Sequence, residues 1–231
     1  MLLALEATDR SGSLALVDEG QAVDISFERS QVTHSERLMP EVDRLLEKHS
    51  ADYSDLTDIA VARGPGSFTA IRLAVTTAKT LALSLDLTVV APTTLRMMAE
   101  YARHRDCLII TALDARRGEV YTQDFRRNDN ILEAQTQPRL MEPEELREHC
   151  EDTDASVLIF KGRDLSPDWT RWPDQTEVFP ERLLDPLVSG LVQLSSGPEK
   201  SSYTMEPDAV NPLYVRKSDA QRSRSEDGVA V

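Results

Sequence analysis

The stretch Arg63-Gly64-Pro65-Gly66-Ser67-Phe68-Thr69 separates a short apolar run from a long amphipathic pattern. Residues 58–62 before it predict a strand, and residues 67–85 after it repeat apolar side chains at helical spacing. The glycines allow a sharp turn between strand and helix, and Ser67 suits the helix N-cap. Backbone N–H groups at such a helix start favour a phosphate, although the same residues also form purely structural turns. The sequence does not continue as the Gly-Lys-Ser/Thr of a P-loop, so it does not support a Walker-type ATPase.

The helix predicted over 67–85 is apolar on more than one face. Phe68, Ile71 and Val75 form one stripe, and alanines spaced four residues apart form a second. The small side chains would let a neighbouring helix approach closely, as in a helical bundle. The helix therefore needs cover on two sides: its own sheet on one, and either the helix after Thr33 or a partner chain on the other. The alanines are Ala70, Ala74, Ala78 and Ala82.

The preceding residues predict an antiparallel meander followed by a helix. Three β-type runs are joined by turn-forming links rich in Asp, Gly and Ser. A helical face follows, with Thr33 and Glu36 spaced as a capping box. Pro40 either kinks this helix or lies in its first turn, if the helix begins near Met39. The runs are 2–5, 13–17 and 22–27, and the helical face holds Leu38, Val42, Leu45 and Leu46.

The later residues repeat this order of elements in a shorter and more irregular form. With a strand at 88–91 and a helix at 93–103, the first hundred residues are predicted to alternate as βββαβαβα. A second βββαβ unit follows, and then a helix weakened by Pro186. Residues 217–231 are polar and charged and are predicted to be disordered. The second part comprises strands 107–113, 119–125, 131–137 and 156–160 and helices 143–150 and 181–194.

The composition is that of a globular, acidic chain. Lys and Arg number 26 and Asp and Glu 40, a net charge of −14, so tRNA or DNA binding by the isolated chain is not expected. No apolar run approaches the ~20 residues that cross a bilayer, and residues 1–6 lack the basic region of a signal peptide. We therefore expect a cytoplasmic protein without membrane contact, in which Cys107 and Cys150 are free, buried thiols.

Charged residues cluster at the first turn of the second unit. The cluster could orient a ligand, or it could form a salt-bridged tight turn. It consists of Asp114, Arg116, Arg117 and Glu119. No two of the four histidines stand at three- or four-residue spacing, and the two cysteines are far apart, so no metal site is predicted. A Gly-x-Ser-x-Gly nucleophile elbow does not occur. The sequence therefore supplies no recognisable nucleophile–base pair.

Four strings of residues together resemble motifs of the TsaB family. Residues 62–72, Ala-Arg-Gly-Pro-Gly-Ser-Phe-Thr-Ala-Ile-Arg, are very similar to the family's signature. Residues 33–40, Thr-His-Ser-Glu-Arg-Leu-Met-Pro, and 112–121, Ala-Leu-Asp-Ala-Arg-Arg-Gly-Glu-Val-Tyr, resemble the motifs before and after it. The ending Asn-Pro-Leu-Tyr-Val-Arg at 211–216 resembles that of the family. The strings follow the family's order and spacing, and the resemblance spans residues 1–216.

The resemblance implies an α/β fold of two ribonuclease-H-like domains, the actin-like ATPase fold, with the second domain smaller and irregular. The order of elements predicted above agrees with this fold. We place the first domain at 1–104, the second at 105–216 and a tail at 217–231. The resemblance also defines a family-motif loop, which consists of Arg63, Gly64, Pro65, Gly66, Ser67, Thr69 and Arg72.

The resemblance further implies a role in forming threonylcarbamoyladenosine in tRNA. In this pathway a synthase makes threonylcarbamoyl-adenylate from threonine, bicarbonate and ATP. TsaD then transfers the threonylcarbamoyl group to N6 of adenosine 37 in tRNAs that read codons beginning with A. A TsaB protein forms a heterodimer with TsaD, the ATPase TsaE joins them, and tRNA is bound through the complex; a homodimer is the alternative when TsaD is absent. The residues expected at the pairing surface are His34, Leu38, Val42, Phe68, Ile71, Ala74, Val75 and Ala78.

Departures from the catalytic relatives predict that the chain is not an enzyme by itself. Working ATPases of this fold carry glycine-rich phosphate and adenosine loops in the second domain, whereas this chain has only isolated glycines after Asp114. The chain also departs from the family's own pattern, because its first strand ends in Glu6-Ala7-Thr8 instead of an Asp followed by a small hydroxyl residue, and Ala70 replaces the usual glycine. His34 has Leu38 where the metal-binding relatives have a second His. We expect a scaffold subunit with no catalytic residue, metal or cofactor of its own, ATP and a metal ion belonging to the partner subunits. A stand-alone actin-fold ATPase or phosphotransferase is the alternative, and a metallopeptidase a more remote one.

Overall fold

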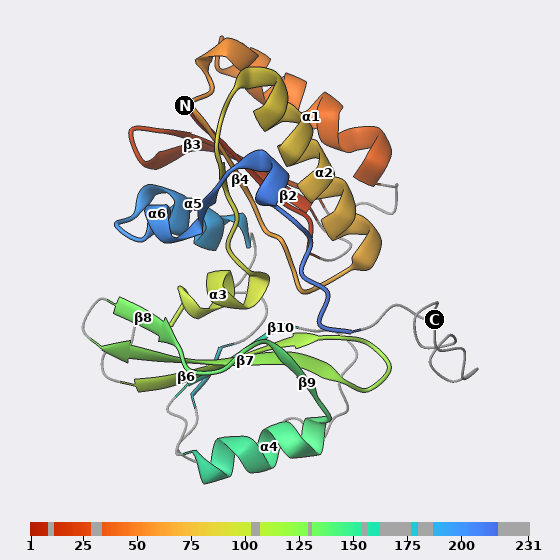
Figure 1. The fold of residues 1–231 in the computed structure, drawn as a ribbon, viewed down its shortest axis with the longest axis vertical. Helices are drawn as coiled ribbons and strands as arrows, with labels where there is room; N and C mark the ends of the chain where they lie inside the picture. Colours follow the sequence, from red (N-terminus) through yellow and green to blue (C-terminus); the bar gives the residue numbers. More distant parts are fainter. Residues whose placement is uncertain are drawn as a thin grey trace.

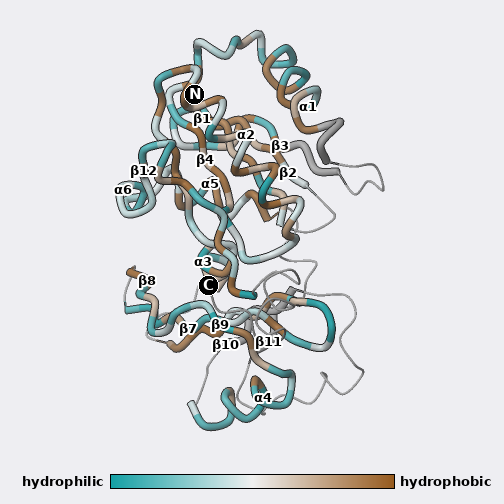
Figure 2. Tube along the Cα trace, turned by 45° about the vertical axis from the view of Figure 1, so that its right-hand side comes forward, coloured by the Kyte–Doolittle hydropathy of each residue, from teal (hydrophilic) through white to brown (hydrophobic). Residues whose placement is uncertain are grey.

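The computed structural model describes residues 1–8, 12–28, 34–102, 107–128, 131–153, 157–161, 177–179 and 187–216. Within these residues the fold is mixed α/β, built on two sheets that lie one above the other in Figure 1. The central strands β1 and β4 are mostly hydrophobic, whereas the outer helices α4 and α6 are mostly hydrophilic (Figure 2). This distribution of hydropathy is what two buried sheets with solvent-facing outer helices require.

The first sheet has the strand order β12-β5-β4-β1-β2-β3. β1, β2 and β3 form an antiparallel meander, and β4 and β5 run parallel to β1. All five residues of β1 are buried, as expected of a central strand covered on both faces. The strands predicted over this region are confirmed. They are β1 (Leu2–Glu6), β2 (Gly12–Asp18), β3 (Gln21–Glu28), β4 (Asp58–Val61) and β5 (Val89–Val90), and the sheet gains one strand that was not predicted, β12 (Thr204–Met205).

Helices cover both faces of the first sheet. α1 (His34–Lys48) and α2 (Phe68–Leu85) lie on one face, where they pack with Leu3 and Leu5 of β1. α5 (Val188–Ser196) packs on the other face, because alternate residues of a strand point to opposite sides. α1 begins at His34 and contains Pro40, so the alternative start near Met39 is wrong. Thr33, the predicted cap, lies outside the described residues.

α2 is the one helix in the described part of the chain that is long and apolar enough to cross a membrane. Length and composition alone give this result, and a core helix of a globular domain passes the same test. The buried stripe of α2 packs against the first sheet, as a core helix does. The stripe consists of Ala70, Ile71, Ala74, Val75, Ala78 and Ala82.

The second sheet repeats the topology of the first. Its order is β11-β10-β6-β7-β8, with β9 paired to β7. β6, β7 and β8 form an antiparallel meander, and β10 and β11 run parallel to β6. α4 (Pro143–Asp152) buries Leu146 and Cys150 against this sheet, and both cysteines are free and buried as predicted. The strands are β6 (Cys107–Asp114), β7 (Val120–Asn128), β8 (Ile131–Ala134), β9 (Arg139–Met141), β10 (Val157–Lys161) and β11 (Glu177–Phe179).

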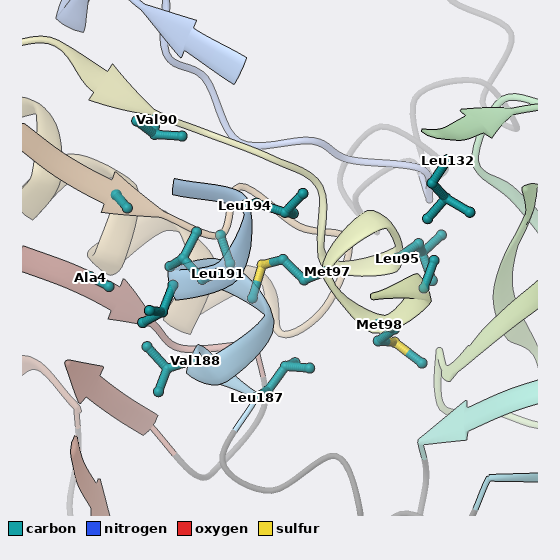
Figure 3. Packing of buried hydrophobic residues seen from close by; sticks show 14 of the residues in the cluster. Ala4, Val90, Leu95, Met97, Met98, Leu132, Leu187, Val188, Leu191 and Leu194 are labelled. Atoms are coloured by element: carbon teal, nitrogen blue, oxygen red, sulfur yellow. The ribbon is translucent and has the colours of Figure 1, made fainter. Parts of the chain in front are cut away.

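One hydrophobic cluster joins the two sheets. The short helix α3 (Thr94–Ala99) lies between them and buries Leu95, Met97 and Met98 completely. Figure 3 shows these side chains between α5 and the strands of the first sheet on one side and Leu132 on the other. The two sheets are therefore packed through a continuous core.

The C-terminal segment returns to the first sheet. α6 (Lys200–Tyr203) leads into β12, which pairs with β5, and a 3-10 helix at Pro207–Ala209 packs near α2. The division predicted at residue 104 would place α5, α6 and β12 with the second sheet, whereas their contacts are with the first. The helix predicted over 181–194 begins at Val188 in the described residues, and residues 180–186 and the predicted tail 217–231 lie outside them.

Candidate functional site

The motif loop, the charged turn and the C-terminal segment meet around one pocket of about 550 Å³. The loop follows β4 of the first sheet, the turn follows β6 of the second, and the C-terminal segment runs between the two sheets (Figure 1). Strings of sequence far apart in the chain thus become neighbours. The lining consists of Thr8, Pro65, Gly66, Ser67, Phe68, Thr69, Leu113, Asp114, Ala115, Arg116, Arg117, Tyr121, Leu213, Tyr214, Val215 and Arg216.

The motif loop is shaped by close backbone contacts. Gly64 has a φ of +103°, and a Cβ there would lie 2.9 Å from the carbonyl oxygen of Leu213. A Cβ on Gly66 would lie 2.5 Å from the carbonyl oxygen of Thr8, which also accepts a hydrogen bond from Ser67 N at 2.7 Å. Glycine is therefore required by the approach of two other segments. Ser67 occupies the predicted N-cap position of α2, although its hydroxyl makes no capping hydrogen bond there.

Arg63 and Thr69 complete the predicted loop in different ways. The main chain of Arg63 is held by a hydrogen bond from its N–H to Pro92 O and by one from Leu213 N to its carbonyl. Its half-buried side chain makes no ion pair with the described residues, and burial lowers the pKa of this guanidinium. Thr69 is exposed and lines the pocket.

An aromatic pair forms one wall of the pocket. The rings of Phe68 and Tyr214 are stacked, with centroids 4.8 Å apart and an interplanar angle of 30°. Arg72 contacts both rings: its Cζ lies 4.3 Å from the Phe68 centroid, and its Nε donates a hydrogen bond of 3.3 Å to the Tyr214 hydroxyl. Both residues remain partly exposed, Phe68 at 44% and Tyr214 at 43%. Sequence reasoning missed Tyr214 as a site residue, although it belongs to the quoted string 211–216.

The charged turn also lines the pocket. Asp114 Oδ1 accepts a 2.6 Å hydrogen bond from Arg116 N, and Glu119 forms an ion pair with Arg216. Arg116 and Arg117 have left-handed φ values of 60° and 58°, which are unfavourable for residues other than glycine. Both side chains are exposed and line the pocket. The turn is thus salt-bridged, but to the C-terminal segment, and its two adjacent arginines face the pocket.

Most residues predicted for the partner surface are core residues. Five of them are 0–1% exposed and pack inside the chain, so they cannot meet a partner in this conformation. The alanine stripe packs on the chain's own sheet, and neither Ala74 nor Ala78 is exposed. Leu38 is half-buried, Phe68 is exposed, and the His34 side chain lies outside the description. The five buried residues, for which the predicted place at the partner surface is wrong, are Val42, Ile71, Ala74, Val75 and Ala78.

α2 presents a different set of residues to solvent. Leu83 is 56% exposed, although it is a large hydrophobic residue. Phe68 lies at the other end of the same helix. The exposed face between them is largely uncharged, which would suit a partner surface. It consists of Phe68, Thr69, Arg72, Thr76, Thr80, Leu83 and Ser84.

Comparison with known proteins identifies the family. The chain is 36% identical to the tRNA threonylcarbamoyladenosine biosynthesis protein TsaB of Bacillus subtilis (strain 168) over 165 residues, 71% of this chain and 72% of the relative. The chain belongs to the TsaB family. TsaB of Escherichia coli (strain K12) is 27% identical over 226 residues, 94% of this chain and 95% of that protein. A family model described as TsaD, tRNA N6-adenosine threonylcarbamoyltransferase, matches residues 27–171.

A solved structure of the same kind supports the fold. YeaZ from Pseudomonas aeruginosa superposes with a TM-score of 0.72 at 26% identity, covering 92% of this chain and 98% of that chain. The resemblance to the TsaB family inferred from the motifs is therefore confirmed. The motifs that carry it at 62–72, 112–121 and 211–216 are those that line the pocket.

Glu6, the acidic residue at the end of β1, has a structural role. Glu6 is 4% exposed, and its carboxylate accepts hydrogen bonds from Thr8 N at 2.6 Å and from the Ser13 hydroxyl at 2.9 Å. This carboxylate holds the end of β1 against β2 and does not line the pocket. Asp114 is the one carboxylate among the described lining residues.

Proposed function

We propose that this chain is the non-catalytic scaffold subunit of the system that forms threonylcarbamoyladenosine at N6 of adenosine 37, in tRNAs that read codons beginning with A. In this role it binds TsaD and supports its activity, TsaE joins the pair, and tRNA is bound through the complex. The observation that carries the proposal is membership of the TsaB family over the greater part of the chain. A homodimer that pairs through the surface used for TsaD is the alternative when TsaD is absent.

The pocket's chemistry favours a scaffold over an independent ATPase. A transferase or ATPase needs groups that activate a nucleophile or hold a metal ion, and these are commonly carboxylates or histidines. Among the described lining residues Asp114 is the one carboxylate, and it accepts a hydrogen bond from Arg116 N. The carboxylate of Glu6 does not line the pocket and accepts a hydrogen bond from Thr8 N. ATP hydrolysis and the metal ion are accordingly assigned to the partner subunits, and the chain to the cytoplasm.

The repeated topology supports a two-domain reading. Both sheets have a meander followed by two parallel strands on the other side of the first strand. We assign them to the two ribonuclease-H-like domains of an actin-like fold. Because α5 and β12 pack with the first sheet, the first domain would contain residues 187–210 in addition to 1–104.

The exposed face of α2 is the proposed pairing surface for TsaD. Leu83→Glu would place a charge in the interface, where a desolvated, unpaired charge costs several kcal/mol, roughly enough to erase a micromolar complex. Ile131→Glu is the matched control, because Ile131 is 60% exposed and lies on β8 of the second sheet. The masses of complexes formed by purified TsaD with each variant are measured by light scattering.

We expect Leu83→Glu to remain folded and lose TsaD, while Ile131→Glu pairs as the wild type does. Undiminished pairing of the folded Leu83→Glu variant would show that α2 is not the contact surface. A separate assay with threonylcarbamoyl-adenylate and unmodified tRNA tests the scaffold role. Adenosine 37 should stay unmodified until TsaD is added, and efficient modification by this chain alone would overturn that role.

A further inference from the structure

The exposed face of α2 differs in sign from the chain to which it belongs. The protein carries a net charge of −14, yet α2 contains no Asp or Glu. Of its two charged residues, Lys79 donates a hydrogen bond to Asp208 O, and Arg72 is the one that belongs to the exposed face between Phe68 and Leu83. This face is therefore complementary to an acidic group of a partner.

The guanidinium of Arg72 is held in place by two aromatic rings. Its Cζ lies 4.3 Å from the centroid of the Phe68 ring, and its Nε donates a 3.3 Å hydrogen bond to the Tyr214 hydroxyl. The two rings stack on each other, and Tyr214 belongs to the C-terminal segment, which is bonded to the loops of both sheets. A guanidinium fixed in this way loses less conformational freedom on binding than an arginine that moves freely at a surface.

The terminal amino groups of Arg72 remain available for binding. They form no ion pair or hydrogen bond with the part of the chain that the structure describes, where the guanidinium bonds through Nε alone. Arg72 is exposed and does not line the pocket, so these groups are open to a partner. The planar fork of a guanidinium matches a carboxylate with two parallel hydrogen bonds. An arginine beside exposed Phe and Tyr side chains also has the composition of an interface hot spot.

We propose that Arg72 binds a surface carboxylate of the partner subunit, in a contact framed by Phe68 and Tyr214. The proposal rests on the proposed function, because the partner is TsaD. A partner that covers the exposed face of α2 removes water from this guanidinium, and a desolvated charge without a counter-charge is costly. A polyanion such as RNA is held by several cations, whereas Arg72 is the one cation of this face, so an acidic side chain fits better than a row of phosphates.

Calorimetric titration of the full chain with purified TsaD tests the contact. Arg72→Gln should weaken pairing by about ten-fold or more, because it leaves the partner's carboxylate without its counter-charge. Arg72→Lys should keep only part of the affinity, because an ammonium group lacks the planar fork. Arg126→Gln is the matched control: it removes the same charge from an exposed arginine of β7 in the second sheet and should pair as the wild type does.

A double-mutant cycle identifies the carboxylate on the partner. The surface Asp and Glu residues of TsaD are changed one at a time to their amides. One of these changes should weaken pairing with the wild-type chain and have little further effect on pairing with Arg72→Gln, because the contact is then already lost. All variants are compared by circular dichroism, so that a loss of binding is read only from folded protein.

Three results would overturn the proposal. The first is an affinity for TsaD that falls no further in Arg72→Gln than in Arg126→Gln, and the second is the lack of any TsaD carboxylate coupled to Arg72. The third is a loss confined to tRNA binding by the complex, which would assign the guanidinium to a phosphate. The Leu83→Glu variant separates this contact from the pairing surface itself. If Leu83→Glu loses TsaD while Arg72→Gln keeps it, α2 remains the pairing surface and the carboxylate contact alone is wrong.

Discussion

Replacing Arg96 by leucine tests the buried ion-pair network around α3. The Arg96 side chain is 5% exposed and pairs with Glu100, which is 8% exposed, and with Glu199, which is 27% exposed. Removing one partner of a buried ion pair leaves an uncompensated charge and costs about 3–5 kcal/mol. Gln193 donates a 2.9 Å hydrogen bond to Glu100, and Arg127 lies 3.8 Å from the same carboxylate. These two groups offset part of the loss, so we expect the lower end, about 3 kcal/mol.

The loss is measured as the change in the free energy of unfolding by denaturant. For a chain of this size it corresponds to a fall of roughly 6–12 °C in the midpoint of thermal unfolding. Glu100→Gln added to Arg96→Leu should recover part of the loss, because it removes the orphaned charge. Arg147→Leu is the control: Arg147 pairs with Glu144 and Glu151 at the surface, where ion pairs contribute little. An Arg96→Leu variant as stable as this control would refute the reasoning.

Two other substitutions have defined outcomes. Hydrogen bonding from Lys48 lowers the pKa of Asp24 to about 2, so its stabilising effect is present above pH ~4, its unfolded value, and is lost as the pH falls towards 2. The difference in unfolding free energy between wild type and Asp24→Asn should shrink over that range, and a constant difference would contradict the assignment. Gly66→Ala should lower the thermal midpoint more than Gly118→Ala, because a Cβ at Gly66 meets Thr8 whereas nothing lies within 4 Å at Gly118. Equal losses would contradict this reading of the loop.

The elements that sequence predicted best are those with clear periodicity. Most predicted strands and helices are present, because alternating or helical patterns of apolar residues follow directly from burial on one or two faces. Short strands such as β9, β11 and β12 carry two or three residues each, too few for a period to be recognised. The return of residues 187–210 to the first sheet depends on tertiary contacts, which no local pattern encodes.

The candidate site was predicted in its parts but not in its assembly. The motif loop and the charged turn are visible in the sequence, yet the contact of Phe68 with Tyr214 joins residues far apart in the chain. The alanine stripe of α2 gave the wrong surface, because small residues permit close packing on a sheet as well as on a partner helix. Leu83 carried no signal of its own, since a single exposed leucine differs from a core leucine only in its position on the folded helix.

The pocket depends on the C-terminal segment 211–216 as much as on the two loops. Its backbone is hydrogen-bonded to Arg63 of the first sheet's loop, and its last residue pairs with Glu119 of the second sheet's turn. Tyr214 lies between these two anchors, so its ring is held against Phe68 by a segment fixed at both sides. The strings that most resemble the family therefore build one structural unit, which lies at the end of α2. The family resemblance accordingly constrains this pocket more tightly than it constrains the outer face of the helix, and the two surfaces require separate experiments.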